Sequence, residues 1–179
     1  WASVQYFSVN DAPNVPTLDL PINGETNVLF KPSLSTTGRD VDANYLRYKI
    51  ELCTDLAMTT NCQTFNQTSS QTGWSGQNAD SGHAYTSGTQ ATYTLQTNLT
   101  PNATYYWRSY AIDPIGSNMW SNTQSTPHHF TILATPLPAT TCFVQESIDD
   151  SQLLVVWADN AENEDHYEVQ RSVDGGAWS

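Results

Sequence analysis

Oxygen-bearing side chains are concentrated at three points of the chain, and they are its best candidates for chemistry. Asp40, Asp42 and Asn44 alternate just before a predicted strand, Asp113 ends another strand, and Asp11 lies in a short entry segment. The two loops and the entry segment are expected at the same end of one module, and Ca²⁺ prefers six to eight hard oxygen ligands. We therefore predict a calcium site at Asp11, Asp40, Asp42 and Asp113. The alternative is that these acids are solvated turn residues that cap backbone amides.

The histidines offer no recognisable catalytic arrangement. The chain has four, His83, His128, His129 and His166, and none lies in a zinc-protease H-E-x-x-H motif. No G-x-S-x-G nucleophile motif is present either. The acidic residues fall in predicted inter-strand loops without cleft-forming insertions beside them, which disfavours a glycosidase pair. We expect a non-enzymatic protein.

Several aromatic residues could form a sugar-binding platform, because aromatic faces pack against the apolar faces of sugars. Trp74, Tyr106 and Tyr110 are the main candidates, with Tyr85 and Trp120 as further members. The alternative is that Trp74 and Trp120 fill the edges of the core, as large aromatic residues in small domains usually do.

The three cysteines indicate one disulfide. Cys53 and Cys62 lie nine positions apart in a segment between strand-like runs, and no histidine or further cysteine nearby has zinc-ligand spacing. A bridge between them predicts an oxidising compartment, extracellular or at a cell surface. Two independent thiols are the alternative. Cys142 remains as a small apolar strand residue or as the partner of a cysteine elsewhere.

The charge balance excludes some partners. Six Lys and Arg residues against 18 Asp and Glu give a formal net charge of −12. Such a surface repels nucleic-acid phosphates and anionic membranes. No apolar run is long enough to cross a bilayer, so we expect no membrane insertion in this segment.

The chain reads as all-β, because apolar residues alternate with polar ones and Pro, Gly, Asn and Ser interrupt the pattern at short intervals. The expected strands are 1–10, 15–20, 27–30, 45–52, 91–97, 104–112, 130–132, 142–144, 153–157 and 167–171, with one or two short ones in 63–88. We expect three parts: the last strand of a preceding module (1–10), a complete β-sandwich (11–133) and the first half of a following module (134–179).

Two segments carry a family resemblance. The first is LTPNATYYWRSYAID from Leu99 to Asp113, which resembles the corner into the sixth strand of fibronectin type III modules. Tyr105 is placed to turn inward and hydrogen-bond the preceding corner through its hydroxyl, as in a tyrosine corner. Alternation then puts Trp107 on the same buried face.

The second segment runs from Leu154 to Gly176 and resembles the second and third strands of that family, with Trp157 as the buried tryptophan. The middle module is similar to bacterial fibronectin-like or cadherin-like repeats, with Phe30 where the family often has tryptophan. The resemblance implies tandem immunoglobulin-like sandwiches, and the four predicted calcium ligands resemble the set that stiffens a cadherin-like joint.

The resemblance implies a structural role and no particular enzymatic activity. We expect an extracellular stalk, spacer or adhesive region whose partners are neighbouring modules of the same or an identical chain, with surface glycans or proteins as further partners. One alternative is a carbohydrate-binding accessory region of a larger secreted enzyme. Another is a filament subunit completed by a strand from the next chain.

Overall fold

The computed structural model describes residues 9–135, 142–149, 152–158, 166–170, 172, 176 and 177. Its contacts divide the chain into two units, Trp1–Leu133 and Ala134–Ser179. Of the strand expected at 1–10, residues 1–8 lie outside the described residues, as do residues 136–141 and 159–165, and residues 9 and 10 are described without strand structure.

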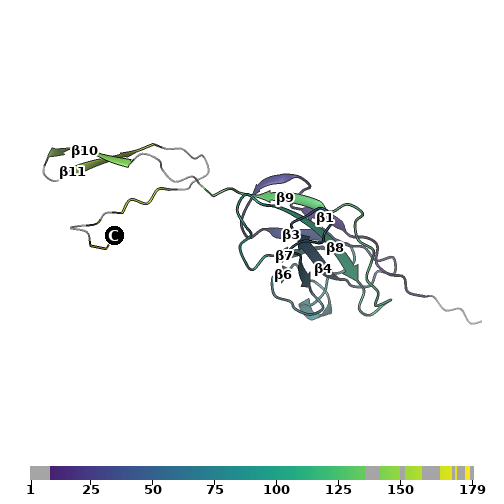
Figure 1. Ribbon diagram of the computed structural model, residues 1–179. Helices are drawn as coiled ribbons and strands as arrows, with labels where there is room; N and C mark the ends of the chain where they lie inside the picture. Colours follow the sequence, from purple (N-terminus) through teal and green to yellow (C-terminus); the bar gives the residue numbers. More distant parts are fainter. Residues whose placement is uncertain are drawn as a thin grey trace, which may run out of the picture. The chain divides into compact units, whose positions relative to one another are not determined.

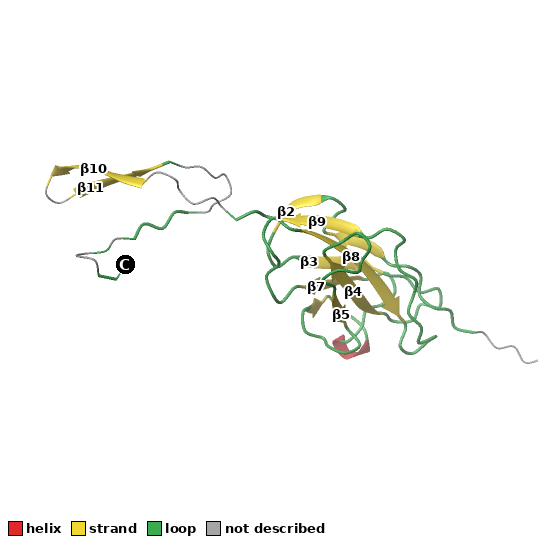
Figure 2. Ribbon diagram, in the orientation of Figure 1, coloured by secondary structure: helices red, strands yellow, loops and turns green. Residues whose placement is uncertain are grey.

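The first unit is a sandwich of two β-sheets (Figures 1 and 2). The four-stranded sheet has the order β1-β3-β7-β6, and the five-stranded sheet has the order β2-β9-β8-β4-β5. The bounds are β1 Thr17–Leu20, β2 Glu25–Val28, β3 Ser33–Thr37, β4 Arg47–Cys53, β5 Gln63–Asn66, β6 Trp74–Ser75, β7 Gln90–Thr94, β8 Thr104–Ile112 and β9 His128–Ile132. The expected all-β sandwich is confirmed.

The first two strands belong to different sheets. β1 pairs antiparallel with β3, whereas β2 pairs parallel with β9 at the edge of the other sheet. The crossing is made at Pro21–Gly24, where Gly24 has a φ of +84° and its N–H donates to the His129 carbonyl at 2.7 Å. Glycine tolerates this left-handed conformation without the steric penalty of a side chain.

Strands β4 and β8 form the centre of the sandwich. They pair antiparallel over seven registered positions, from Arg47↔Ile112 to Cys53↔Tyr106. From Thr104 to Ala111 the odd-numbered residues of β8 are buried and the even-numbered ones half-buried, as the alternation predicted, and the last residue, Ile112, is buried as well. Trp107 and Tyr48 are the largest fully buried side chains. The core therefore lies between these central strands and the inner face of β3 and β7.

The structure adds strands that carry little apolar signal. β3 has the sequence SLSTT, and the sequence pattern did not predict it, because Leu34 is its one apolar residue. Its Thr36 is fully buried and pairs by hydroxyl with Ser109 at 2.7 Å. The Ser- and Thr-rich region 63–88 holds β5 and β6, as expected, and a short 3₁₀ turn at Asp80–Gly82.

The second unit contains a hairpin of β10 (Cys142–Asp149) and β11 (Gln152–Trp157). Residues 167–170, expected within a third strand, are described without strand structure. Trp157 is half-buried, and its ring centroid lies 5.4 Å from that of Tyr167.

Candidate functional site

The loop before β4 is organised around the Asp40 carboxylate. Its Oδ1 accepts the N–H groups of Asp42 at 2.8 Å and Asn44 at 3.2 Å, and the Ala43 N–H donates to the Asp40 carbonyl. Asp40 is only 7% exposed. One carboxylate oxygen thus caps its own turn, as the alternative interpretation of the sequence requires.

The second oxygen of Asp40 is not explained by capping. Asp40 Oδ2 is buried and has no hydrogen-bond partner within the described part of the chain. A buried carboxylate oxygen without a partner is costly, because burial removes its water and nothing replaces it. A bound cation would supply the missing interaction.

The loop after β8 is organised around Asp113, which is fully buried. Ser117 donates to this carboxylate twice, from its N–H to Oδ2 at 2.7 Å and from its hydroxyl to Oδ1 at 2.6 Å. The same N–H also donates to Asn10 Oδ1 at 2.9 Å. The entry segment is therefore connected to this loop by a shared donor.

Three polar side chains converge on Gly116. A Cβ atom at this glycine would overlap Asp113 Oδ2, and would lie 2.5 Å from Asn10 Oδ1 and 2.7 Å from Asn44 Nδ2. Asn44 Nδ2 is buried without a hydrogen-bond partner among the described residues. A carboxamide presents oxygen instead of nitrogen after a half-turn of its terminal group. The arrangement then offers three oxygen atoms directed at one small volume.

We call the end of the sandwich where residues 10–11, 40–44 and 113–118 meet the entry pole. Asp11 contributes through its backbone, because its N–H donates to Asp42 Oδ2 at 2.9 Å. In residues 9–135 none of the four predicted aspartates forms an ion pair, and the carboxylates that do are those of Asp80 and Glu51. The entry pole is thus rich in oxygen and negatively charged, which suits a hard cation such as Ca²⁺.

The predicted ligand set is assembled in two halves. Asp40, Asp42 and Asp11 form one chain of hydrogen bonds, and Asp113 joins Asn10 and Asn44. Among the described residues, no three of the four aspartates bring their carboxylates within 4.8 Å of one another. Asparagine side chains therefore have to complete any cation site here.

Asn10, Gly116 and Ser117 were not assigned to the site from the sequence. Asn10 precedes Asp11 in the entry segment, so its position was a usable signal. Ser117 lies four residues after Asp113, and Gly116 is the small residue beside it. A serine and a glycine after a strand are too common to indicate a site, and only the folded loop shows their role.

The predicted structural residues lie where expected in the first unit. Tyr105 Oη accepts the Thr100 N–H at 3.1 Å, so the tyrosine corner is present, and Trp107 is fully buried. Cys53 and Cys62 form a disulfide with a Cα–Cα distance of 4.1 Å. The bridge connects the end of β4 to the residue before β5.

The predicted aromatic platform is divided between two places. Trp74 is only 8% exposed and packs in the core with Tyr93, as the alternative interpretation has it. Tyr106 and Tyr110 are half-buried on the outer face of β8. There the Lys49 ammonium lies 3.9 Å from the Tyr110 ring centroid, and Tyr110 donates to Glu51 at 3.1 Å.

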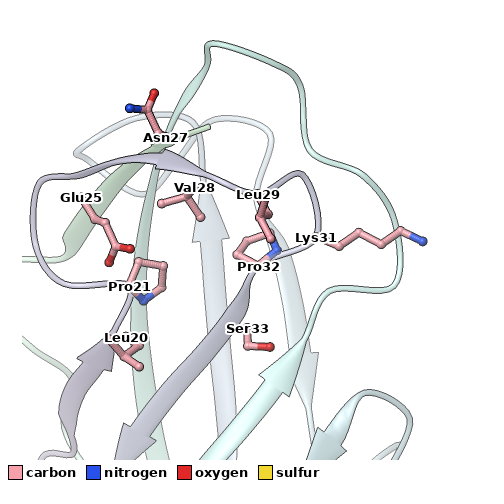
Figure 3. Close-up of a pocket in the computed structure, with 9 residues that line it drawn as sticks. All are labelled: Leu20, Pro21, Glu25, Asn27, Val28, Leu29, Lys31, Pro32 and Ser33. Carbon is pink, nitrogen blue, oxygen red and sulfur yellow. The ribbon is translucent and has the colours of Figure 1, made fainter. Parts of the chain in front are cut away.

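A separate pocket of about 350 Å³ lies beside the crossing from β1 to β2 (Figure 3). Glu25 lines it, but its Oε2 already accepts the Ile22 N–H at 2.8 Å and so stabilises the turn. The Lys31 side chain extends away from the other lining residues (Figure 3). This pocket therefore brings no pair of reactive groups together.

Neither the models of known protein families nor the curated protein sequences match this chain. In the described residues, no helix is long and apolar enough to cross a membrane.

Proposed function

We propose that this chain is a non-enzymatic, extracellular structural region in which β-sandwich modules act as a stalk, spacer or adhesive unit. The strand orders β1-β3-β7-β6 and β2-β9-β8-β4-β5 support an immunoglobulin-like module, since immunoglobulin domains distribute their strands between two sheets in a similar order. The disulfide at Cys53–Cys62 supports an oxidising compartment.

The observation that carries the proposal is the unpartnered, buried Asp40 Oδ2 at the entry pole. The residues that precede the sandwich are hydrogen-bonded to this pole, through Asn10 to Ser117 and through the Asp11 N–H to Asp42. A cation held there by Asp40, Asp113 and the two asparagines would fix the direction in which the chain enters the module. A stalk or spacer needs this rigidity at each joint.

The test is calcium-dependent stability. Extracellular calcium modules bind with dissociation constants on the order of 10⁻⁴–10⁻³ M. At about 10 mM Ca²⁺ such a site would stabilise the folded state by about 1.4–2.7 kcal/mol, because the ion binds the folded chain preferentially. We expect the thermal midpoint measured by circular dichroism to be higher in calcium than in chelator.

Two variants identify the site. Asp40→Asn should abolish the calcium effect without lowering the midpoint in chelator, since it removes the uncompensated buried charge. Asp55→Asn changes a carboxylate in the disulfide loop and should keep the calcium effect, whatever it does to the baseline. Equal melting of the wild-type chain in calcium and in chelator would contradict the proposal.

A further inference from the structure

A groove lies at the side of the sandwich, between the edge strand β5 of one sheet and the edge strand β6 of the other. Its volume is about 330 Å³, within the range of small-molecule sites. We call it the side groove. The entry pole contributes none of its lining residues.

Three aromatic side chains line the side groove. Phe65 of β5 stacks on Tyr93 of β7 with ring centroids 4.3 Å apart and planes 21° apart, and Trp74 of β6 lies 5.2 Å from the same tyrosine. Phe65 is half-buried, whereas Trp74 and Tyr93 are 8% and 6% exposed. The two buried rings hold Phe65 in place across the two sheets, so Phe65 offers a rigid apolar surface at the groove.

The polar lining of the side groove consists of hydroxyl and amide groups. Thr64, Ser69 and Thr72 are exposed, and their hydroxyls form no hydrogen bond within residues 9–135. Asn66 has its Oδ1 occupied by Thr68, whose N–H and hydroxyl donate to it at 2.9 and 2.8 Å, which leaves its Nδ2 as a donor. These groups can exchange their water for the hydroxyls of a ligand at little cost.

Gly73 lets the segment that carries Ser69 and Thr72 approach the Tyr93 ring closely. Its φ is +85°, and a Cβ atom there would lie 2.6 Å from Tyr93 Cε2. A side chain would therefore push the segment away from the tyrosine. The glycine is required both for its backbone conformation and for the close approach of the chain to the ring.

None of the described residues that line the side groove is charged, although 13% of the chain is charged. The pocket beside β2, by contrast, is lined by Glu25 and Lys31. A ligand that suits the side groove has an apolar face for the accessible side of Phe65 and several uncharged hydrogen-bonding groups around it. This combination describes a pyranose sugar, whose C–H groups form one face and whose hydroxyls surround it.

We propose that the side groove binds a neutral oligosaccharide, with Phe65 against the sugar face, the buried rings of Tyr93 and Trp74 holding Phe65 in place, and Thr64, Asn66, Ser69 and Thr72 on the sugar hydroxyls. This function is additional to the structural role of the module and involves other residues than the cation site. If the side groove bound no oligosaccharide, the proposed cation site would be unaffected, and the reverse also holds.

The experiment is a titration of the full ¹⁵N-labelled chain, followed by NMR. The probes are the hexasaccharides of β-1,4-glucose, β-1,4-xylose, β-1,4-mannose and N-acetylglucosamine, with hexagalacturonate as the acidic comparison. We expect at least one neutral probe to shift the amide signals of residues 64–74 in a saturable way. Hexagalacturonate should not, because the groove has no cation to pair with its carboxylates.

Variants then show whether the oligosaccharide binds in the side groove or on another surface. Phe65→Ala should weaken binding at least tenfold, and Ser69→Ala with Thr72→Ala several-fold, with the fold of each verified by its thermal melt. Tyr106→Ala removes an aromatic ring from the outer face of β8 and should bind as the wild type does. Should Phe65→Ala fail to fold, Ser69→Trp at an exposed position fills the groove and must abolish binding.

Three results would overturn this proposal. One is the absence of saturable shifts with every neutral probe at about 10 mM, a concentration that reveals binding of only about 3 kcal/mol. Another is a set of shifts centred on Tyr106 and Tyr110 and lost in Tyr106→Ala. The third is tighter binding of hexagalacturonate than of all neutral probes, which would place the ligand beside the cations of β4 and β8.

Discussion

At the scale of the residue, Tyr105 shows how one hydroxyl stabilises a corner. Its ring is buried near Phe130, and its oxygen accepts the Thr100 N–H at 3.1 Å, at the loop that leads into β8. Tyr48 does the same elsewhere, since its oxygen accepts the Gly38 N–H at 2.8 Å and burial raises the pKa of this phenol to about 12. Both tyrosines satisfy a backbone donor that would otherwise lack a partner.

Tyr105→Phe keeps the packing of the ring and removes only the acceptor of the Thr100 N–H. We expect the free energy of unfolding to fall by about 0.5–1.5 kcal/mol, the usual net value of one hydrogen bond. Urea denaturation with an unchanged m-value would measure it. Tyr106→Phe is the matched control on the exposed face of the same strand, and an equal loss in both variants would contradict the role of the corner.

At the scale of the element, the outer faces of β4 and β8 are held together by charge. Glu51 of β4 lies opposite Arg108 of β8, whose Nε donates to it at 2.8 Å, and Lys49 lies 3.6 Å from the same carboxylate. Burial by itself would raise the pKa of Glu51, but the hydrogen bond and charge of Arg108, with Lys49 and Tyr110, lower it below its ordinary value of 4.5. The cluster therefore favours the ionised carboxylate in the folded state.

A lowered pKa in the folded state makes stability depend on pH. Glu51 contributes stability above its unfolded pKa of 4.5, and this contribution is lost as the pH falls through the lower, folded value. We expect the stability difference between the wild type and Glu51→Gln to be constant near neutral pH and to shrink below about pH 4.5. Glu25→Gln, outside this cluster, is the control, and a difference that stays unchanged as the pH falls below 4.5 would contradict the assignment.

At the scale of the whole molecule, the first unit contains what a stable domain needs. Two sheets enclose a common core, and a disulfide connects β4 to β5. The second unit contributes the hairpin of β10 and β11 among its described residues. An isolated two-stranded hairpin is at best marginally stable in water.

We therefore expect the fragment 9–135 to unfold in a single transition, with the same thermal midpoint as the full chain. Scanning calorimetry of both proteins, in calcium and in chelator, would measure this. A lower midpoint for the fragment would mean that residues outside 9–135 stabilise the sandwich. In that case the two units that meet at Leu133 would not unfold independently of each other.

The sequence alone determined the elements whose physical signal is local. The alternation in β8 predicted its exact bounds, because a strand with one buried face repeats every two residues. The tyrosine corner and the Cys53–Cys62 pair were also predictable, since both depend on residues close in the chain. The short strands β5 and β6 were expected in their region but could not be placed within it.

Only the tertiary structure decided which distant residues meet. β3 has no apolar alternation, and its buried Thr36 is explained by a hydroxyl of β8 that lies 73 positions away. The approach of Asn10 to Ser117, and of Asn44 to Gly116, depends on how two loops and the entry segment pack at one pole. The stack of Phe65 on Tyr93 joins the edge strand β5 of one sheet to the inner strand β7 of the other. Such contacts form when the two sheets pack against each other. The pattern of side chains along one strand does not show which residues of the other sheet it will meet.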